Sequence, residues 1–466
     1  MEQLHIMHTN DLHSHFENFP RIQRYIADER LQDQILNQET LVFDIGDATD
    51  REHPLTEATL GQANIEWMNQ IHYDAVTIGN SEGLYYDHQI LEHLYDQANF
   101  PVVLANLWEN NGQLPHFAQA YQMLTTRQGT KIGVIGLTAS YKRTYPLVQW
   151  DVHPAADVLP SLLTKLRPQV DILILLSHLG LNQDRQLAQT YPELDLIIGA
   201  HTHHLLPQGE QQRHTWLAAA GKYGEQVGNI YLDLENHHLQ TVRVKTTPVT
   251  EINSQPEDQT WILEQQRKGE RLLEEQVVAT LPVQYERVPA PHSSLDLTFQ
   301  AMEELTNCQI ALLNTGLFLT TLLAGPVTEN DLHRQLPHAI HVMKTTLSGQ
   351  DLWRLAMEVE KNRGFLSNFI QKGMGFRGKF FGDLVWDGLE VDPRTRQVFY
   401  QHQPLQPSQK YQIALLDHYL FIPFFPTIEI MGENEIIYPD FLRTIVSKYL
   451  QRTFGGGEKR DDKTGK

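Results

Sequence analysis

The sequence predicts an α/β chain built in two parts, a layered domain of alternating strands and helices followed by a smaller α+β domain. Its 466 residues exceed the size of one ordinary domain. Short apolar runs alternate with longer amphipathic stretches through the first half, and this regular alternation is lost in the second half. We therefore expect a first domain at 1–250, a connecting helix at 251–284, a second domain at 285–453 and a disordered tail at 454–466.

Seven short runs rich in Val, Ile and Leu predict the buried strands of the first domain. They lie at 4–9, 41–47, 74–80, 101–106, 131–137, 171–178 and 194–201. Helices are expected between them, at 19–36, 56–69 and 155–166. Strands that alternate with helices in this way indicate a layered α/β arrangement.

The second half begins after a charged stretch of helix-forming residues, 257–278, which predicts the connecting helix. Beyond it we expect helices at 294–305 and 349–362, with strands at 311–316 and 411–417. Because strands and helices do not alternate strictly here, the second domain is predicted to be α+β.

Composition excludes several classes of protein. The formal net charge of −20 argues against a partner such as DNA or RNA, because phosphate backbones are bound by clustered Lys and Arg. The single cysteine, Cys308, allows no intrachain disulfide. Neither a secretory signal nor an apolar run of membrane-spanning length is found, so we expect a cytoplasmic protein without a membrane partner.

Polar side chains follow the apolar runs at the points where five strands are predicted to end. The segments are HTNDLHSH at 8–15, DIGDATD at 44–50, TIGNSEG at 77–83, LLSHLG at 175–180 and IGAHTHH at 198–204. In α/β sheets the carboxyl ends of the strands are where binding sites form. Carboxylate, amide and imidazole groups in this number suit two divalent cations such as Zn, Mn or Fe. The predicted metal ligands are Asp11, His13, Asp47, Asn80, His178, His201 and His203.

The ordered set D-x-H, G-D, G-N, H and G-H-x-H resembles the calcineurin-like metallophosphoesterase superfamily. HTNDLHSH is similar, more narrowly, to the opening of its 5'-nucleotidase and 2',3'-cyclic-nucleotide phosphodiesterase branch. The resemblance implies a layered α-β-β-α catalytic domain followed by a C-terminal substrate-binding domain. It also implies that Asp11, His13 and His203 hold one metal, that Asn80, His178 and His201 hold the other, and that Asp47 is shared.

The third motif departs from that branch, which usually carries G-N-H-[DE]. Here the histidine is replaced by Ser81, and the acid that commonly orients it is replaced by Leu84. A serine hydroxyl cannot act as a general acid near pH 7, so His15, His53 and His204 are considered as substitutes. We expect Asn80, Ser81 and His15 to take part in catalysis.

The second domain departs as well. The family's N-x-G-x-[x]-R segment is reduced to Asn314 and Gly316 without the arginine. Such enzymes usually hold the nucleobase between two aromatic rings, and stacking on a ring is worth about 1 to 3 kcal/mol. The candidates here are Phe376, Phe380 and Phe381, with Arg377 to meet an anionic group. A core or hairpin role explains the same aromatic residues equally well.

Three functions are consistent with these observations. The first is hydrolysis of a phosphate ester of a nucleotide-like small molecule by a hydroxide that bridges two metals, as the resemblance implies. The second is a phosphodiesterase or pyrophosphatase acting on cyclic nucleotides, dinucleotides or nucleotide sugars, whose acidic leaving groups need a general acid less. The third is a metal-containing nucleotide-binding or regulatory protein with little turnover, which the loss of histidine at Ser81 favours.

Overall fold

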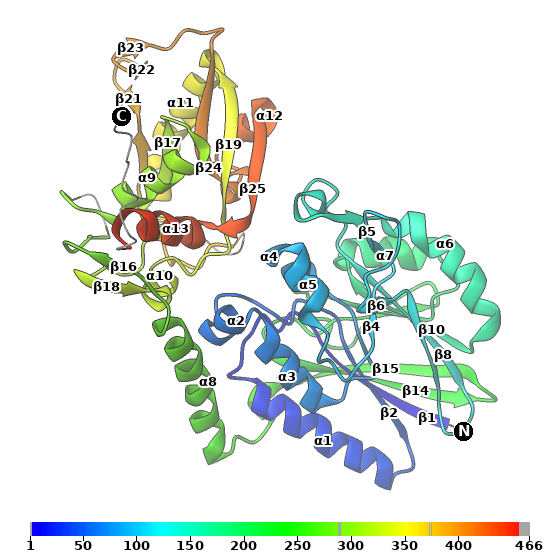
Figure 1. The fold of residues 1–466 in the computed structure, drawn as a ribbon. Coiled ribbons are helices and arrows are strands. Elements are labelled where there is room, and N and C mark those ends of the chain that lie inside the picture. Colours follow the sequence, from blue (N-terminus) through cyan, green and yellow to red (C-terminus); the bar gives the residue numbers. More distant parts are fainter. Residues whose placement is uncertain (1, 288–289, 372, 374, 456–466) are drawn as a thin grey trace, which may run out of the picture. The chain divides into compact units, whose positions relative to one another are not determined.

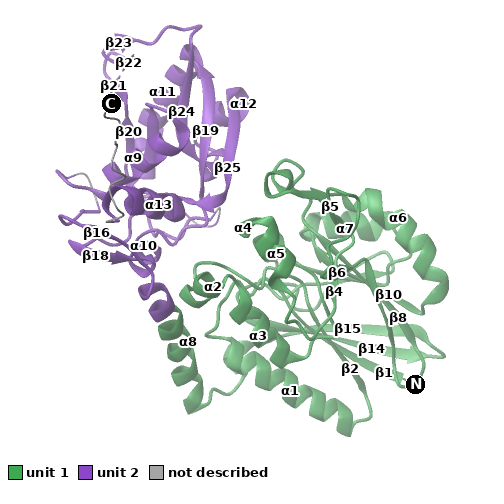
Figure 2. Cartoon of the chain, viewed as in Figure 1, with its two compact units in different colours: residues 1–269 green, residues 270–466 purple. Residues whose placement is uncertain are grey.

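The computed structural model describes residues 2–287, 290–371, 373 and 375–455. The chain divides into two compact units, Met1–Gly269 and Glu270–Lys466, coloured separately in Figure 2. Most of the predicted tail, 456–466, lies outside the described residues. No described helix is both long and apolar enough to cross a membrane.

Unit 1 contains two large sheets that face each other. The first has the strand order β15-β14-β1-β2-β3-β4-β6, and the second has the order β12-β13-β11-β10-β8-β7. A core of aliphatic side chains from both sheets, including Ile6, Phe43, Val134 and Ile174, lies between them. The strands are β1 (Glu2–Thr9), β2 (Glu39–Asp44), β3 (Ala75–Val76), β4 (Val102–Val103), β6 (Ala118–Gln119), β7 (Tyr121–Thr125), β8 (Lys131–Thr138), β10 (Ile172–His178), β11 (Leu196–Gly199), β12 (Glu210–Gln212), β13 (Thr215–Ala218), β14 (Gln226–Glu235) and β15 (His238–Pro248). A separate pair is formed by β5 (Leu107–Glu109) and β9 (Trp150–Val152).

Helices cover the outer faces of both sheets, which completes the four-layered arrangement seen in Figure 1. On the outer face of the second sheet, Leu173 and Leu175 belong to the same buried cluster as Leu159 and Leu163 of the covering helix at 155–166. The helices of unit 1 are α1 (Phe19–Ile35), α2 (Pro54–Thr59), α3 (Gln62–Ile71), α4 (Asn80–Tyr85), α5 (His88–Leu94), α6 (Ala155–Leu166) and α7 (Leu181–Thr190), with short 3-10 turns η1 (Tyr145–Val148), η2 (Arg167–Gln169) and η3 (Val249–Glu251).

One predicted helix is divided in the structure. The stretch 56–69 was expected to be continuous, but α2 ends and α3 begins around Leu60 and Gly61. Both residues have left-handed backbones, with φ of 49° and 85°, which an α-helix cannot include. A side chain at position 61 would also meet the Tyr86 hydroxyl, so glycine is required at this break.

The connecting helix is shorter than the predicted 251–284. Helix α8 spans Pro256–Glu274, and β16 (Val277–Leu281) then pairs with β18 (Gly325–Thr328). Its first part packs on unit 1, where the Trp261 ring stacks on Phe19 with centroids 5.9 Å apart. A Cβ at Gly269 would lie 2.2 Å from the Leu55 backbone nitrogen, so a glycine permits this close approach of helix to helix.

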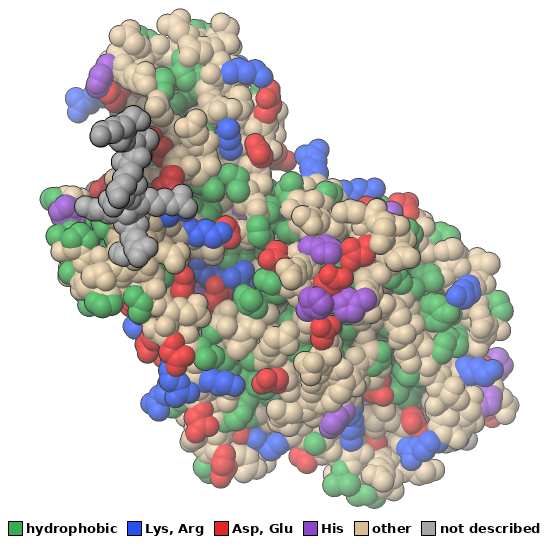
Figure 3. Space-filling model, viewed as in Figure 1, with side chains coloured by type: hydrophobic (Ala, Val, Ile, Leu, Met, Phe, Trp, Pro, Cys, Tyr) green, Lys and Arg blue, Asp and Glu red, His purple; other side chains and the backbone are tan. Residues whose placement is uncertain are grey.

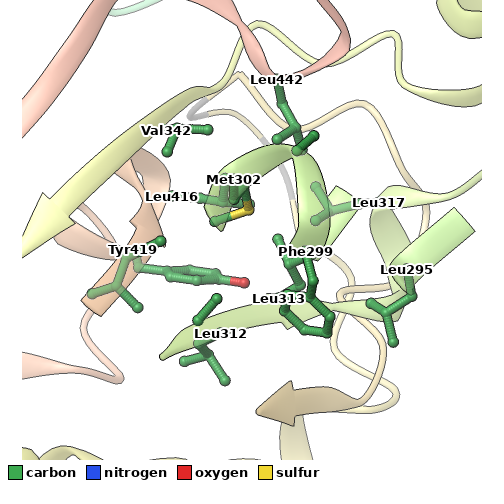
Figure 4. Close-up of a cluster of buried hydrophobic side chains, with 14 of the residues drawn as sticks. Leu295, Phe299, Met302, Leu312, Leu313, Leu317, Val342, Leu416, Tyr419 and Leu442 are labelled. Carbon is green, nitrogen blue, oxygen red and sulfur yellow. The ribbon is translucent and has the colours of Figure 1, made fainter. Parts of the chain in front are cut away.

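Unit 2 is built on a five-stranded sheet with the order β20-β17-β24-β19-β25. Figure 4 shows part of its core, where Met302 and Phe299 lie beside Leu312, Leu313 and other buried side chains. The strands are β17 (Ala311–Asn314), β19 (His341–Ser348), β20 (Leu384–Asp387), β24 (Lys410–Leu416) and β25 (Glu433–Phe441), with the smaller sheet β21 (Leu389–Asp392), β22 (Gln397–Tyr400) and β23 (Gln403–Pro404). The helices are α9 (Ser294–Thr306), α10 (Glu329–Gln335), α11 (Gly349–Leu366), α12 (Pro426–Met431) and α13 (Leu442–Phe454), with 3-10 turns η4 (Thr315–Leu317) and η5 (Asp417–Leu420). The second unit is therefore α+β, as predicted.

Candidate metal centre

The five predicted motifs meet at one edge of the two sheets. In the first sheet β1, β2 and β3 run parallel, with Thr9 level with Asp44 and Asp44 level with Val76. In the second sheet β10 and β11 also run parallel, with Ser177 level with Gly199. The motifs follow the carboxyl ends of these strands, as expected for a site in an α/β fold. Figure 3 shows histidine and acidic side chains gathered close together on one face of the molecule.

The first group of candidate ligands consists of Asp11, His13 and His203. The His203 Nε2 atom lies 3.5 Å from Asp11 Oδ1 and 3.4 Å from His13 Nε2. The Asp11 carboxylate is fixed by the side-chain amide of Asn10, which donates to Oδ2 at 2.8 Å, and by the backbone N–H of His201. The three side chains come from two loops about 190 residues apart in the chain, and they converge on one point.

The second group consists of Asp47, His178 and His201. The His178 Nε2 atom lies 3.3 Å from Asp47 Oδ2, and the same oxygen lies 3.5 Å from His13 Nε2 in the first group. One carboxylate oxygen therefore faces both groups. The backbone N–H of Ser81 donates to the other oxygen, Oδ1, at 2.7 Å, which fixes the carboxylate's orientation.

Two observations indicate that the residues of the two groups can hold divalent cations. Ligand atoms bound to one zinc ion at about 2.0 to 2.2 Å in a tetrahedron lie about 3.3 to 3.6 Å apart. The His203 Nε2 and His178 Nε2 distances given above, 3.3 to 3.5 Å, match this separation, and His13 Nε2 lies 4.0 Å from Asp11 Oδ1. In addition, His178 Nε2 and Asn80 Oδ1 are buried without a hydrogen-bond partner among the described residues. Buried polar atoms normally have partners, so these two atoms are oriented for a ligand that the protein itself does not provide.

Charge at the site follows from the same geometry. Burial alone would lower the pKa of His178, but the carboxylates of Asp47 and Asp11 outweigh it and raise this pKa to about 10. Burial, together with nearby histidines, lowers the pKa of His201 and His203 to about 4, so these two imidazoles are neutral at pH 7. A neutral imidazole is the form that binds a metal.

Glu82 holds the loops that carry the ligands, and its role was not predicted from the sequence. Its buried carboxylate accepts hydrogen bonds from the backbone N–H groups of Asp47 at 3.0 Å, Thr49 at 2.8 Å and Gly79 at 2.9 Å. The partners are main-chain atoms, so no pattern of side chains indicates them. The acid that follows Gly79-Asn80-Ser81 was the only signal in the sequence.

The predicted catalytic residues take different positions. Asn80 begins α4 beside the second group, while the Ser81 hydroxyl is buried without a partner among the residues described. His15 lies at the margin, where its Nδ1 contacts Glu17 Oε1 at 2.6 Å and its ring stacks on Tyr223 at 3.8 Å. Of the other histidines weighed as substitutes, His53 caps α2 through Nδ1, and the exposed His204 contacts Thr202.

In unit 2 most of the predicted substrate-binding residues are packed against one another. Phe376 and Phe381 are 3% and 0% exposed, and the Phe381 carbonyl accepts hydrogen bonds from the Asn314 side chain and the Gly316 backbone. Phe376 and Phe381 are core side chains here, which agrees with the core role that the sequence left open beside nucleobase stacking. Phe380 is 43% exposed, and Arg377 is half-buried with its backbone N–H donating to His338.

Comparison with known proteins matches both halves of the chain. Residues 4–205 match the model of calcineurin-like phosphoesterases, and residues 277–421 match that of the 5'-nucleotidase C-terminal domain. A Bacillus subtilis (strain 168) protein, "Uncharacterized metallophosphoesterase YunD", is 35% identical over 459 residues, covering 96% of this chain and 98% of its own. A Vibrio vulnificus (strain CMCP6) protein described as a 5'-nucleotidase is 24% identical over 75% of this chain and 74% of its own length.

Among solved structures, that of Haemophilus influenzae NAD nucleotidase is 16% identical to this chain with a TM-score of 0.63, and the match covers 97% of this chain and 96% of its own. The fold and the ligand set together define a metallophosphoesterase, a hydrolase that uses divalent metal ions. The chain belongs to the calcineurin-like phosphoesterases, and within them to the members that carry a 5'-nucleotidase-type C-terminal domain.

Proposed function

We propose that this protein hydrolyses a phosphate ester of a nucleotide or a nucleotide-like small molecule, with two divalent cations held by the seven side chains at the sheet edge. The observation that carries the proposal is the position of Asp47 Oδ2, which faces His13 Nε2 and His178 Nε2 at 3.5 and 3.3 Å. A relative described as a 5'-nucleotidase supports the nucleotide-like substrate.

When bound, two such cations neutralise charge on the phosphoryl oxygens and make water a stronger nucleophile at neutral pH. The chain's own residues hold that arrangement in place. Asp47 is the shared ligand, and the Ser81 N–H fixes its second oxygen. Glu82 ties together the loops after β2 and β3, so that Asp47 and Asn80 keep their separation. Preorganised groups of this kind contribute to catalysis because they need not rearrange during the reaction.

A second candidate function rests on Ser81. Because the serine hydroxyl cannot supply a proton near pH 7, esters with acidic leaving groups are favoured over simple alkyl monoesters. Phosphodiesters and pyrophosphates, including cyclic nucleotides, dinucleotides and nucleotide sugars, fall in that class. A protein that binds metal and nucleotide without turnover is the third candidate.

Metal analysis, followed by assays on a panel of phosphate esters, distinguishes the three candidate functions. We expect about two ions per chain, and hydrolysis of nitrophenyl phosphate, AMP and a nucleotide pyrophosphate in the presence of Mn²⁺. Faster hydrolysis of pyrophosphates and nitrophenyl esters than of AMP would support the second candidate. Two bound ions without hydrolysis of any ester would contradict the enzymatic proposal and leave the binding function.

A further inference from the structure

Tyr141 lies beside the second ligand group, although no motif in the sequence indicated it. It follows β8, which runs parallel to β10 with Thr138 level with His178, so the loop after β8 leaves the sheet at the metal-binding edge. The Tyr141 hydroxyl lies 3.1 Å from His201 Nε2, and the two rings meet edge to face with centroids 5.9 Å apart.

The loop that carries Tyr141 is held in place even though the side chain is 42% exposed. The Tyr141 carbonyl accepts hydrogen bonds from the backbone N–H groups of Thr144 and Tyr145, at 2.9 and 3.1 Å. Tyr145 is fully buried and packs on α4, where a Cβ at Gly83 would lie 2.3 Å from its hydroxyl. The position of the Tyr141 hydroxyl therefore depends on packing against the helix that begins with Asn80.

The two histidines of the second group are held through opposite ring nitrogens. His178 Nδ1 is 2.7 Å from the Ile45 carbonyl oxygen, to which it donates, and this leaves Nε2 directed at Asp47. In His201, by contrast, the Nε2 atom has a hydrogen-bond partner, which is the Tyr141 hydroxyl. A histidine that binds a metal through one nitrogen generally carries its proton on the other and donates it to a nearby acceptor.

We propose that Tyr141 is a positioning residue of the metal centre, whose hydroxyl oxygen accepts a hydrogen bond from His201 Nε2–H and leaves Nδ1 as the ligand atom. The inference rests on the proposed function only in taking the seven side chains as a metal centre. Tyr141 has the same role for His201 that the Ile45 carbonyl has for His178. A backbone carbonyl cannot be removed by substitution, but a tyrosine hydroxyl can.

Metal binding to the chelator-stripped full chain tests this assignment. Tyr141→Phe keeps the ring and removes only the hydroxyl. We expect calorimetric titration with Mn²⁺ to show one of the two binding steps weakened by about 10- to 100-fold, the usual effect of losing such a partner, and the other nearly unchanged. Lys142→Ala, an exposed neighbour in the same loop, is the matched control and should leave both steps as in the wild type.

A second variant separates the hydrogen bond from the packing of the ring. Tyr141→Gln supplies an acceptor oxygen on a smaller side chain, and part of the lost affinity should return. Wild-type affinity for both ions in Tyr141→Phe would overturn the assignment, and so would a wild-type chain that binds no metal. If the wild type binds two ions but hydrolyses no ester, the proposed function fails while the binding data still decide the role of Tyr141.

Discussion

The metal-binding edge of unit 1 and the segment 376–381 of unit 2 were both assigned to function from their sequence, and they differ in what folding does with their side chains. At the edge, side chains that lie at or after the ends of β1, β2, β10 and β11 converge until candidate ligand atoms lie 3.3 to 3.5 Å apart. In the segment, two of the three aromatic rings are buried in the core of their own unit.

The two regions also differ in the charge of their buried histidines. His178 and His418 are both inaccessible to solvent, yet their pKa values move in opposite directions. Carboxylates facing His178 raise its pKa to about 10, whereas burial, with a small contribution from His338, lowers the pKa of His418 to about 3. Burial away from carboxylates keeps His418 neutral, whereas the carboxylates beside His178 stabilise its protonated form.

The largest effect is expected from removing the shared ligand. Asp47→Ala should lower hydrolysis by at least about 10³-fold, since both cations lose a ligand and about 4 kcal/mol of barrier corresponds to that factor. Activity on nitrophenyl phosphate and metal content by elemental analysis would both report it. Asp151→Ala, with a side chain 55% exposed, is the control and should retain both. Full metal content in Asp47→Ala would contradict the arrangement described above.

The next test concerns the aromatic residues of unit 2. Phe381→Ala should destabilise the unit by about 3 to 5 kcal/mol, as for other large core side chains, while Phe380→Ala should cost less than about 1 kcal/mol. Hydrogen exchange of peptides from β17 and β24 in increasing urea reports on this unit alone. If Phe381→Ala left the unit's stability unchanged and weakened substrate binding instead, the contrast drawn between the two regions would be wrong.

A smaller effect is expected at Ser81. Ser81→His restores the side chain usual in this branch, and we expect the ratio of AMP to nitrophenyl phosphate hydrolysis to rise about tenfold, because a proton donor helps poor leaving groups most. Ser81→Ala should be nearly silent, as the hydroxyl has no hydrogen-bond partner in the described part of the chain. An unchanged ratio in Ser81→His would remove the reason for favouring acidic leaving groups.

The smallest expected effect is the release of a proton from His178 when a metal ion binds. With the pKa of His178 at about 10 in the metal-free protein, its ring carries a proton at pH 8 that a cation must displace. Metal affinity should therefore rise with pH up to about pH 10, with about one proton released per chain from this residue. Calorimetry in buffers of different ionisation enthalpy measures that release, and His178→Gln should abolish it.

The sequence was a good guide to which side chains gather at the sheet edge and a poor guide to the residues that support them. Asp47 and His178 could be predicted because each follows an apolar strand, and strand ends of one α/β sheet share an edge. Glu82 binds backbone amides and Tyr141 a single imidazole, so both depend on loop positions that no spacing reveals. For Phe376 the sequence left a nucleobase-stacking role and a core role equally open, and in the structure its ring stacks on buried His338 with planes 3° apart.

Five of the seven predicted ligands, Asp11, His13, Asp47, His201 and His203, have left-handed backbones with φ between 46° and 74°. A left-handed conformation costs a residue other than glycine about 1 kcal/mol, so the backbone at this edge carries several kcal/mol of conformational strain. Glycine at these positions would remove the strain, but it has no side chain to bind an ion. Cations bound at this edge would hold these loops in place, and we expect chelation to free their backbone amides to exchange with solvent before any other part of unit 1.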